Sequence, residues 1–290
     1  MKSVRIAALL TLTAYSTAAS AQSDAALDRV EARLDRLERR EPPRVRLGPG
    51  ETETHPWELS FSLPFTWNSN VASAPTNPDA AFHADPTITL GKKWDVGSSQ
   101  FFFEANADSD AYTAHSENDS STLSAQAGVR FGDASTGVAP YVHYTVLALY
   151  AGQLDAHDVT IHHFTVGAKR SWTAGEHGRL ILDVNALRRE ATLRTVEQTR
   201  GTTSLTYAAD IDDTTSWSLS ARGQYAHYTG GTSSGRDDAA LRLLGGVTFL
   251  LGDHATLDIQ ASFQRNWSDR AGKEYSVWDI GPTIGFSTRF

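Results

Sequence analysis

Apolar and polar residues alternate with a period of two along most of the chain, from residue 57 to residue 290. In the segment WELSFSLPFTW (57–67) every second residue is aromatic or Leu, and the residues between them are Glu, Ser, Pro or Thr. Segments 123–131 and 257–264 repeat this alternation. Because successive side chains of a strand point to opposite faces, each segment is predicted to be a strand with one apolar and one polar face.

Strands of about ten residues with this two-faced pattern are typical of a transmembrane β-barrel. The predicted strands are roughly 57–68, 82–94, 99–107, 122–132, 139–150, 159–172, 179–188, 203–211, 216–228, 240–251, 255–267 and 276–290. Their connections alternate between compact turns and long polar loops, and short turns of such barrels face the periplasm. Both ends of the barrel segment are therefore expected in the periplasm, and the pairing around 188–205 is left open as longer or shorter.

The seven tryptophans distinguish this pattern from a soluble β-sandwich, whose strands also alternate. All of them fall near predicted strand ends, some beside short turns and others beside long loops. Two aromatic girdles at the bilayer interfaces produce that placement, whereas a sandwich tends to bury Trp in mid-strand. The predicted membrane girdle consists of Trp57, Trp67, Trp94, Trp172, Trp217, Trp267, Trp278 and Phe290.

The last predicted strand carries Ile284, Phe286 and Phe290 on its apolar face and ends on an aromatic residue. In this the chain resembles the outer-membrane β-barrel proteins of Gram-negative bacteria, whose C-terminal strand ends in Phe. The resemblance covers 57–290 and the leader, and it is to the porin-like class, not to one family. It implies an antiparallel up-and-down barrel in the cell outer membrane, in contact with membrane lipid and lipopolysaccharide and inserted by the barrel-assembly machinery.

Residues 1–56 are organised differently from the barrel segment. Lys2 and Arg5 precede an uncharged apolar run, and Ala19-Ser20-Ala21 follows it, which indicates a signal peptide over residues 1–21. The run is shorter than the roughly 20 residues of a membrane-spanning helix. Residues 42–56, rich in Pro, Gly and charge, are predicted to be a linker, and 57–290 the barrel.

Residues 22–41 contain Leu27, Val30, Leu34 and Leu37 at 3-4-3 spacing, the seam of a short amphipathic or coiled-coil helix. A helix this short is marginal alone in water, so its seam needs a partner. We leave two partners open: copies of the helix in a homo-oligomer, with these four residues as the oligomerisation surface, or the inside of the following domain. A solvated spacer helix is a third interpretation. Its position ahead of the barrel predicts that the helix lies in the periplasm.

If the apolar strand face meets lipid, the polar face lines the lumen. The predicted pore-lining residues are Glu58, Asp85, Lys93, Glu104, Arg130, Lys169, Asp183, Arg222, Arg242, Asp258, Asp279 and Arg289. In a water-filled channel such charges select among the permeating ions. If they pair with one another across the lumen instead, they close it. A twelve-strand barrel is intermediate between filled eight-strand barrels and open porins. We therefore predict a narrow pore for passive or selective passage of small polar solutes; the alternative is a structural or anchoring barrel with a plugged lumen and a helical arm.

Composition and spacing argue against several other functions. The net charge of −8 disfavours nucleic acid as a partner, and the chain has no Cys. His162 and His163 are adjacent, so on a strand they point to opposite faces and do not share a metal. Asp210, Asp212 and Asp213 lack the spacing of a calcium loop. No metal and no cofactor are expected.

An enzymatic site is not expected either. The chain contains no H-x-S triplet, and its one G-x-S-x-G string, GTSSG at 231–235, falls in a predicted polar loop and not at the strand-to-helix turn of the Ser hydrolases. H-x-T triplets begin at His143, His163, His227 and His254, but His and Thr are ordinary residues of a polar barrel face. The sequence therefore predicts a protein that is not an enzyme.

Overall fold

The computed structural model describes residues 27, 29–37, 39, 57–76, 78–152 and 154–290. The predicted signal peptide (1–21), the predicted linker (42–56) and parts of the predicted helix lie outside the described residues. Within the described part of the chain, no helix is long and apolar enough to cross a membrane.

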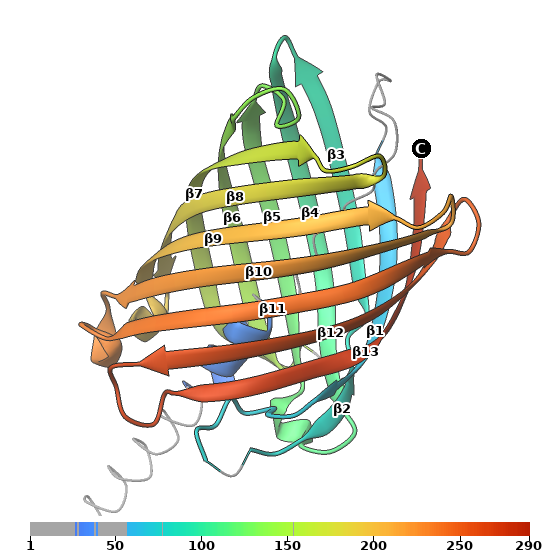
Figure 1. Cartoon of the computed structure of the whole chain (residues 1–290). Coiled ribbons are helices and arrows are strands. Elements are labelled where there is room, and N and C mark those ends of the chain that lie inside the picture. Colours follow the sequence, from blue (N-terminus) through green and yellow to red (C-terminus); the bar gives the residue numbers. More distant parts are fainter. Residues whose placement is uncertain (1–26, 28, 38, 40–56, 77, 153) are drawn as a thin grey trace, which may run out of the picture.

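One antiparallel sheet contains all the strands of the described residues. They are β1 (Glu58–Asn68), β2 (Ala81–Ala84), β3 (Thr87–Val96), β4 (Ser99–Tyr112), β5 (Ser120–Phe131), β6 (Ala139–Ala151), β7 (Ala156–Thr173), β8 (Gly178–Ala191), β9 (Gln198–Asp210), β10 (Thr215–Tyr228), β11 (Asp237–Leu250), β12 (Ala255–Ser268) and β13 (Tyr275–Arg289). β13 pairs with β1, which closes the sheet into a barrel (Figure 1). β2 and β3 both lie between β1 and β4, so the wall has twelve strand positions, and the predicted twelve-strand barrel is confirmed.

The second predicted strand, 82–94, is interrupted between β2 and β3 at Asp85 and Pro86. Pro86 has no backbone N–H to give to the ladder. The neighbouring groups find partners nonetheless, because the Asp85 N–H donates to the Pro64 carbonyl at 3.1 Å and the Ser109 N–H donates to the Pro86 carbonyl at 3.2 Å. The break therefore costs the wall little backbone bonding.

Around 188–205 the strands pair over the longer of the two spans left open. β8 continues to Ala191 and β9 starts at Gln198, joined through the 3-10 turn η2 (Arg194–Val196). Arg189 lies opposite Gln198 in the register. This extension makes the wall taller at its long-loop end.

The outer face of the wall is apolar and exposed. On β13, Trp278, Ile284 and Phe286 have exposed fractions of 48%, 43% and 51%. At the short-turn end the Lys92 ammonium lies 5.3 Å from the Trp57 ring centroid. Such a surface is stable only against lipid, because contiguous exposed apolar area of this extent is avoided in water. The tryptophans lie near the ends of the strands. That they form girdles at the two bilayer interfaces stays a prediction.

Candidate functional site

The N-terminal helix, described over residues 29–37, lies inside the barrel at its long-loop end (Figure 1). Arg33 bonds Asp108 of β4 and Thr122 of β5. On another side of the wall, Gln264 of β12 donates to Asp35 at 2.8 Å. A short helix reaches strands on different sides of a closed sheet only from within. The lumen is therefore occupied at this end by the chain itself.

The apolar seam of the helix packs on the inner wall. Val30 and Leu34 are 3% and 4% exposed and form one cluster with barrel residues, and Leu27 packs at its edge. The barrel members of the cluster are Leu149, Val159, Ile161 and Val196. Burying an aliphatic side chain of this size contributes about 1.5–3 kcal/mol. The contact supplies the partner that so short a helix requires.

This packing contradicts two expectations for the helix: that its seam is an oligomerisation surface, and that the helix lies in the periplasm. Val30 and Leu34 face barrel residues instead of a second copy, and Leu27 and Leu37 are themselves partly buried. The helix also lies at the long-loop end, opposite the short turns. The physical reason is that the barrel interior offers a matching apolar patch within the same chain. Of the partners left open, the structure shows the inside of the following domain.

Buried ion pairs fix one side of the helix to β4. Arg33 pairs with Asp108 and Asp110, and the Arg36 Nε lies 3.4 Å from Asp110 Oδ2. The side chains of Arg33 and Asp110 are 3% and 0% exposed. Arg36 also donates to the Val71 carbonyl at 3.0 Å. Charges this deeply buried persist only when they are paired, so the wall and the helix depend on each other here.

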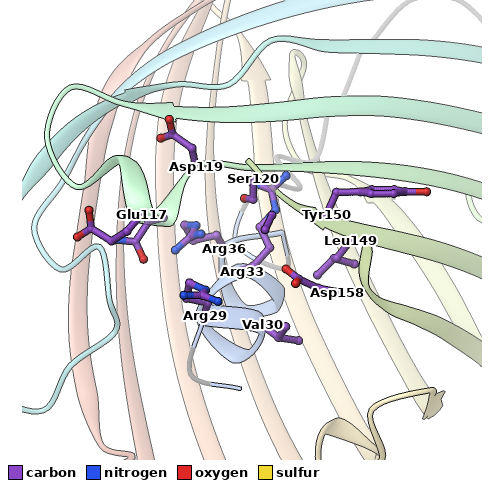
Figure 2. Close-up of a pocket in the computed structure, with 12 residues that line it drawn as sticks. Arg29, Val30, Arg33, Arg36, Glu117, Asp119, Ser120, Leu149, Tyr150 and Asp158 are labelled. Atoms are coloured by element: carbon purple, nitrogen blue, oxygen red, sulfur yellow. The ribbon is translucent and has the colours of Figure 1, made fainter. Parts of the chain in front are cut away.

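Figure 2 shows this side of the helix, with Arg29, Arg33 and Arg36 projecting from it among the surrounding strands. A residual cavity of about 20 Å³ remains there, bordered by Asp119 and Asp158 among others. That volume holds about one water molecule. Between these arginines and the wall, the lumen is therefore filled.

A second set of polar contacts fixes the opposite side of the helix. Glu31 Oε1 accepts from the Arg236 guanidinium at 3.0 Å, and its Oε2 accepts from the Lys273 ammonium at 2.8 Å. Asp35 accepts from Gln264 and, at 3.3 Å, from the Ser73 hydroxyl. These contacts join the helix to β12 and to three long loops: the one between β1 and β2, the one between β10 and β11, and the one between β12 and β13.

A cavity of about 590 Å³ lies between this side of the helix and the wall. Its lining combines amides, hydroxyls and charged groups from β8 to β13 with the helix residues Leu27, Glu31, Leu34 and Asp35. A volume of this size accommodates a small organic solute. The long-loop half of the lumen thus contains both the helix and an unfilled polar chamber beside it.

The predicted pore-lining residues lie, by the alternation of their strands, on the face that carries the helix contacts. They are Glu58, Asp85, Lys93, Glu104, Arg130, Lys169, Asp183, Arg222, Arg242, Asp258, Asp279 and Arg289. The structure does not gather them at one point. Asp279 meets the helix, because the Arg39 Nε lies 3.2 Å from its Oδ2. Their role in permeation stays a prediction.

The short-turn half of the lumen is wetter than the helix-filled half. Glu58 and Arg289 approach to 3.7 Å there, with side chains 48% and 42% exposed. Higher in the lumen, Asp183 accepts from the Tyr141 hydroxyl at 2.8 Å. The Arg130 guanidinium donates to Gln100 at 3.0 Å. Polar side chains here bond to neighbours along the wall.

The residues that hold the helix were not predicted from the sequence. They are Glu31, Arg33, Arg36, Asp108, Asp110, Arg236 and Lys273. One signal was present, since Arg29, Arg33 and Arg36 repeat at helical spacing beside the apolar seam. A solvated helix has the same pattern, so only the fold shows that these arginines face carboxylates.

Two sequence features that resembled metal sites are explained by ordinary contacts. His162 bonds the Tyr144 hydroxyl at 2.6 Å on the outer face, while His163 accepts from Arg189 on the inner face, so the two rings point apart as predicted. Asp212 accepts from the backbone and hydroxyl of Thr214, and these bonds lower the pKa of its carboxyl. Among the described residues, no group of three or more His, Asp or Glu is arranged to hold a metal.

The histidines of the H-x-T triplets also have structural partners. His143 stacks on Tyr141 with ring centroids 5.7 Å apart, and His227 bonds Asp237 at 2.8 Å. His254 lies 3.1 Å from the Ser287 carbonyl. The expectation that the protein is not an enzyme stays a prediction.

No protein-family model matches this chain, and no curated protein matches it in sequence. Solved structures do match. An outer-membrane channel from Pseudomonas putida F1 aligns with a TM-score of 0.51 at 10% identity, over 84% of this chain and 100% of that one. The translocator domain of the autotransporter NalP from Neisseria meningitidis aligns with a TM-score of 0.48 at 13% identity, over 92% and 98%. The KdgM porin aligns at 0.45 and 5%, over 79% and 99%.

At these identities the likeness concerns the fold alone. The fold is that of an outer-membrane β-barrel. Together with the exposed apolar outer face, it places the protein in the cell outer membrane.

Proposed function

We propose that the protein is an outer-membrane channel for small polar solutes whose lumen is closed at the long-loop end by its own N-terminal helix. The observation that carries the proposal is the way the helix is held. Its apolar contact is confined to one small cluster, and most of its remaining bonds are ion pairs and hydrogen bonds to the wall.

A polar interface of this kind suits a closure that can reverse. Water and mobile ions replace the partners of a charged side chain when it leaves, whereas a large apolar contact has no such substitute. The chamber of about 590 Å³ beside the helix supports the same proposal. A permanently filled core is instead packed with few voids larger than water.

The second candidate is the structural or anchoring barrel with a plugged lumen. The observation in its favour is the Arg33, Asp108 and Asp110 cluster, whose side chains are at most 8% exposed. In that case the helix is a permanent part of the core. The two candidates differ in whether the lumen conducts when the helix is displaced.

Conductance in planar bilayers tests the proposal. Val30→Asp with Leu34→Asp places two carboxylates against the apolar cluster, which displaces the helix while leaving the wall strands unchanged. We expect small or rare currents from the wild type and larger, sustained currents from the double variant. The control is Ile211→Asp with Leu251→Asp, which adds the same charges at turn positions that are 63% and 59% exposed. This control is expected to behave as the wild type.

Heat-modifiable migration and circular dichroism establish that each variant forms the barrel. A folded Val30→Asp, Leu34→Asp variant that carries no current contradicts the channel and favours the structural barrel. A wild type that conducts as well as the double variant contradicts closure by the helix.

A further inference from the structure

The charges around the large cavity are divided between its two sides. Among the described lining residues, the wall contributes the basic side chains Arg189, Arg200, Arg236, Arg270 and Lys273, and one acidic side chain, Asp238. The other two acidic residues of the lining, Glu31 and Asp35, belong to the helix. The wall is thus cationic, and the helix supplies the larger share of the compensating carboxylates.

Glu31 occupies a preformed site on that wall. One of its oxygens accepts from Arg236 at 3.0 Å and the other from Lys273 at 2.8 Å. The two cations come from different loops and converge on a single carboxylate. Charge-assisted bonds to both oxygens are the arrangement by which proteins recognise a carboxylate ligand.

The Arg236 side chain is held in place without help from the helix. Its guanidinium lies 3.7 Å from the centroid of the Tyr228 ring, and it pairs with Asp238 at 3.2 Å. The side chain is 3% exposed. A cation fixed by stacking and by a carboxylate two residues further along the chain keeps its orientation when Glu31 leaves.

We propose that this wall is a binding site for small polycarboxylate solutes, and that Glu31 is an internal stand-in for their carboxylate. This inference rests on the proposed channel function and names its solute class. A solute entering from the long-loop end competes with Glu31 for Arg236 and Lys273. Its remaining carboxylates face the other basic residues of the same wall. Binding therefore weakens the attachment of the helix on this side.

The proposal has two parts: a latch, meaning the contact of Glu31 with Arg236 and Lys273 that holds the helix, and a solute-binding site on the wall. Two variants separate these parts. Glu31→Gln and the double variant Arg236→Gln, Lys273→Gln both remove the same two ion pairs, so both loosen the helix. Only Glu31→Gln leaves the two cations in place. Glu176→Gln, at a turn residue whose side chain is 94% exposed, is the matched control for Glu31→Gln.

The readout is single-channel current with citrate added to the long-loop side at constant ionic strength. We expect both latch variants to conduct more than the wild type and Glu176→Gln. We expect citrate to block Glu31→Gln saturably, at a half-blocking concentration about tenfold or more below that of the double variant, because two charge-assisted bonds are lost in the latter. Glycerol at the same concentration is expected to have no such effect.

Equal half-blocking concentrations in the two variants overturn the site. If Glu31→Gln and the double variant conduct no more than the wild type, while the Val30→Asp, Leu34→Asp channel does conduct, the latch is overturned. If that channel is silent, the proposed function itself has failed, and citrate binding is then measured by calorimetry on the same detergent-solubilised variants. Tighter binding to Glu31→Gln than to the double variant supports the site even then. If the double variant does not fold, Lys273→Gln alone, at a 28% exposed side chain, replaces it.

Discussion

The two halves of the lumen use similar side chains in different surroundings. At the long-loop end, Arg33 meets Asp110 with both side chains almost completely buried. At the short-turn end, Glu58 meets Arg289 with both side chains more than 40% exposed. Both contacts join a guanidinium to a carboxylate inside the same barrel. What differs is the helix, which excludes water from one contact and not from the other.

This difference shows that the inner face of a barrel has no single character. The rows of the outer face that meet lipid have one character, exposed and apolar. On the inner face, the consequence of a charged pair depends on whether the helix covers it. An exposed pair is screened by water and contributes about 0–1 kcal/mol. A buried pair is costly to break, because the remaining charge has no solvent.

The largest expected effect follows from breaking the buried contact. Arg33→Met leaves Asp108 and Asp110 facing an apolar side chain, and losing one partner of such a buried cluster costs about 3–5 kcal/mol. We expect a large drop in the urea midpoint of unfolding, or release of the helix detected as faster hydrogen exchange over 29–37. Glu58→Gln at the exposed pair is the control, with a change within about 1 kcal/mol. Equal effects of the two substitutions contradict the comparison.

A smaller effect is expected on ion selectivity. Arg130 lies in the wetter half and Arg242, which is 9% exposed, in the helix-filled half. In the Val30→Asp, Leu34→Asp channel, Arg130→Gln removes a positive charge from the ion path, so the reversal potential is expected to shift toward cations at unchanged stability. Arg242→Gln in the otherwise wild-type chain is expected to lower stability as well. The comparison fails if Arg130→Gln leaves selectivity unchanged and destabilises the barrel.

The smallest effect concerns a short turn. Ser135 donates its hydroxyl and its N–H to Asp133, and these bonds lower the pKa of the carboxyl. A lowered pKa in the folded state stabilises the fold above the ordinary value of about 4, and this contribution disappears as the pH falls through the lowered pKa. Asp133→Asn is expected to lower the unfolding midpoint slightly at pH 7 and to match the wild type under strongly acidic conditions. A pH-independent difference contradicts this origin.

The wall was predictable from the sequence because lipid imposes one rule on its outer face. Alternation such as that of 57–67 gave the strand period, and the exposed row of Trp278, Ile284 and Phe286 matches it. The predicted strand 82–94 missed the interruption at Pro86, which arises because this residue has no backbone N–H for the ladder. Pairing near 188–205 was left open because Arg and Thr suit both a strand above the membrane and a loop.

The position of the helix was not predictable in the same way. The seam of Val30 and Leu34 showed that a partner was needed but not which one. The partners Leu149, Val159 and Ile161 lie more than a hundred residues away in the sequence, and the alternation along their own strands does not connect them with the seam. The same holds for Glu31 and Lys273, whose pairing depends on a loop conformation. Contacts between distant segments are fixed by topology, which the local period does not contain.

The position of the helix inside its own barrel is tested most directly by a cross-link. The chain has no Cys, so Asp35→Cys with Ser73→Cys introduces only the two thiols of a pair whose side chains now approach to 3.3 Å. After mild oxidation of the folded protein, denaturing electrophoresis and peptide mapping reveal which thiols have joined. We predict a disulfide between positions 35 and 73 of the same chain. Disulfide-linked dimers joined through position 35, with no link inside a chain, would contradict the account and restore the helix as an oligomerisation arm.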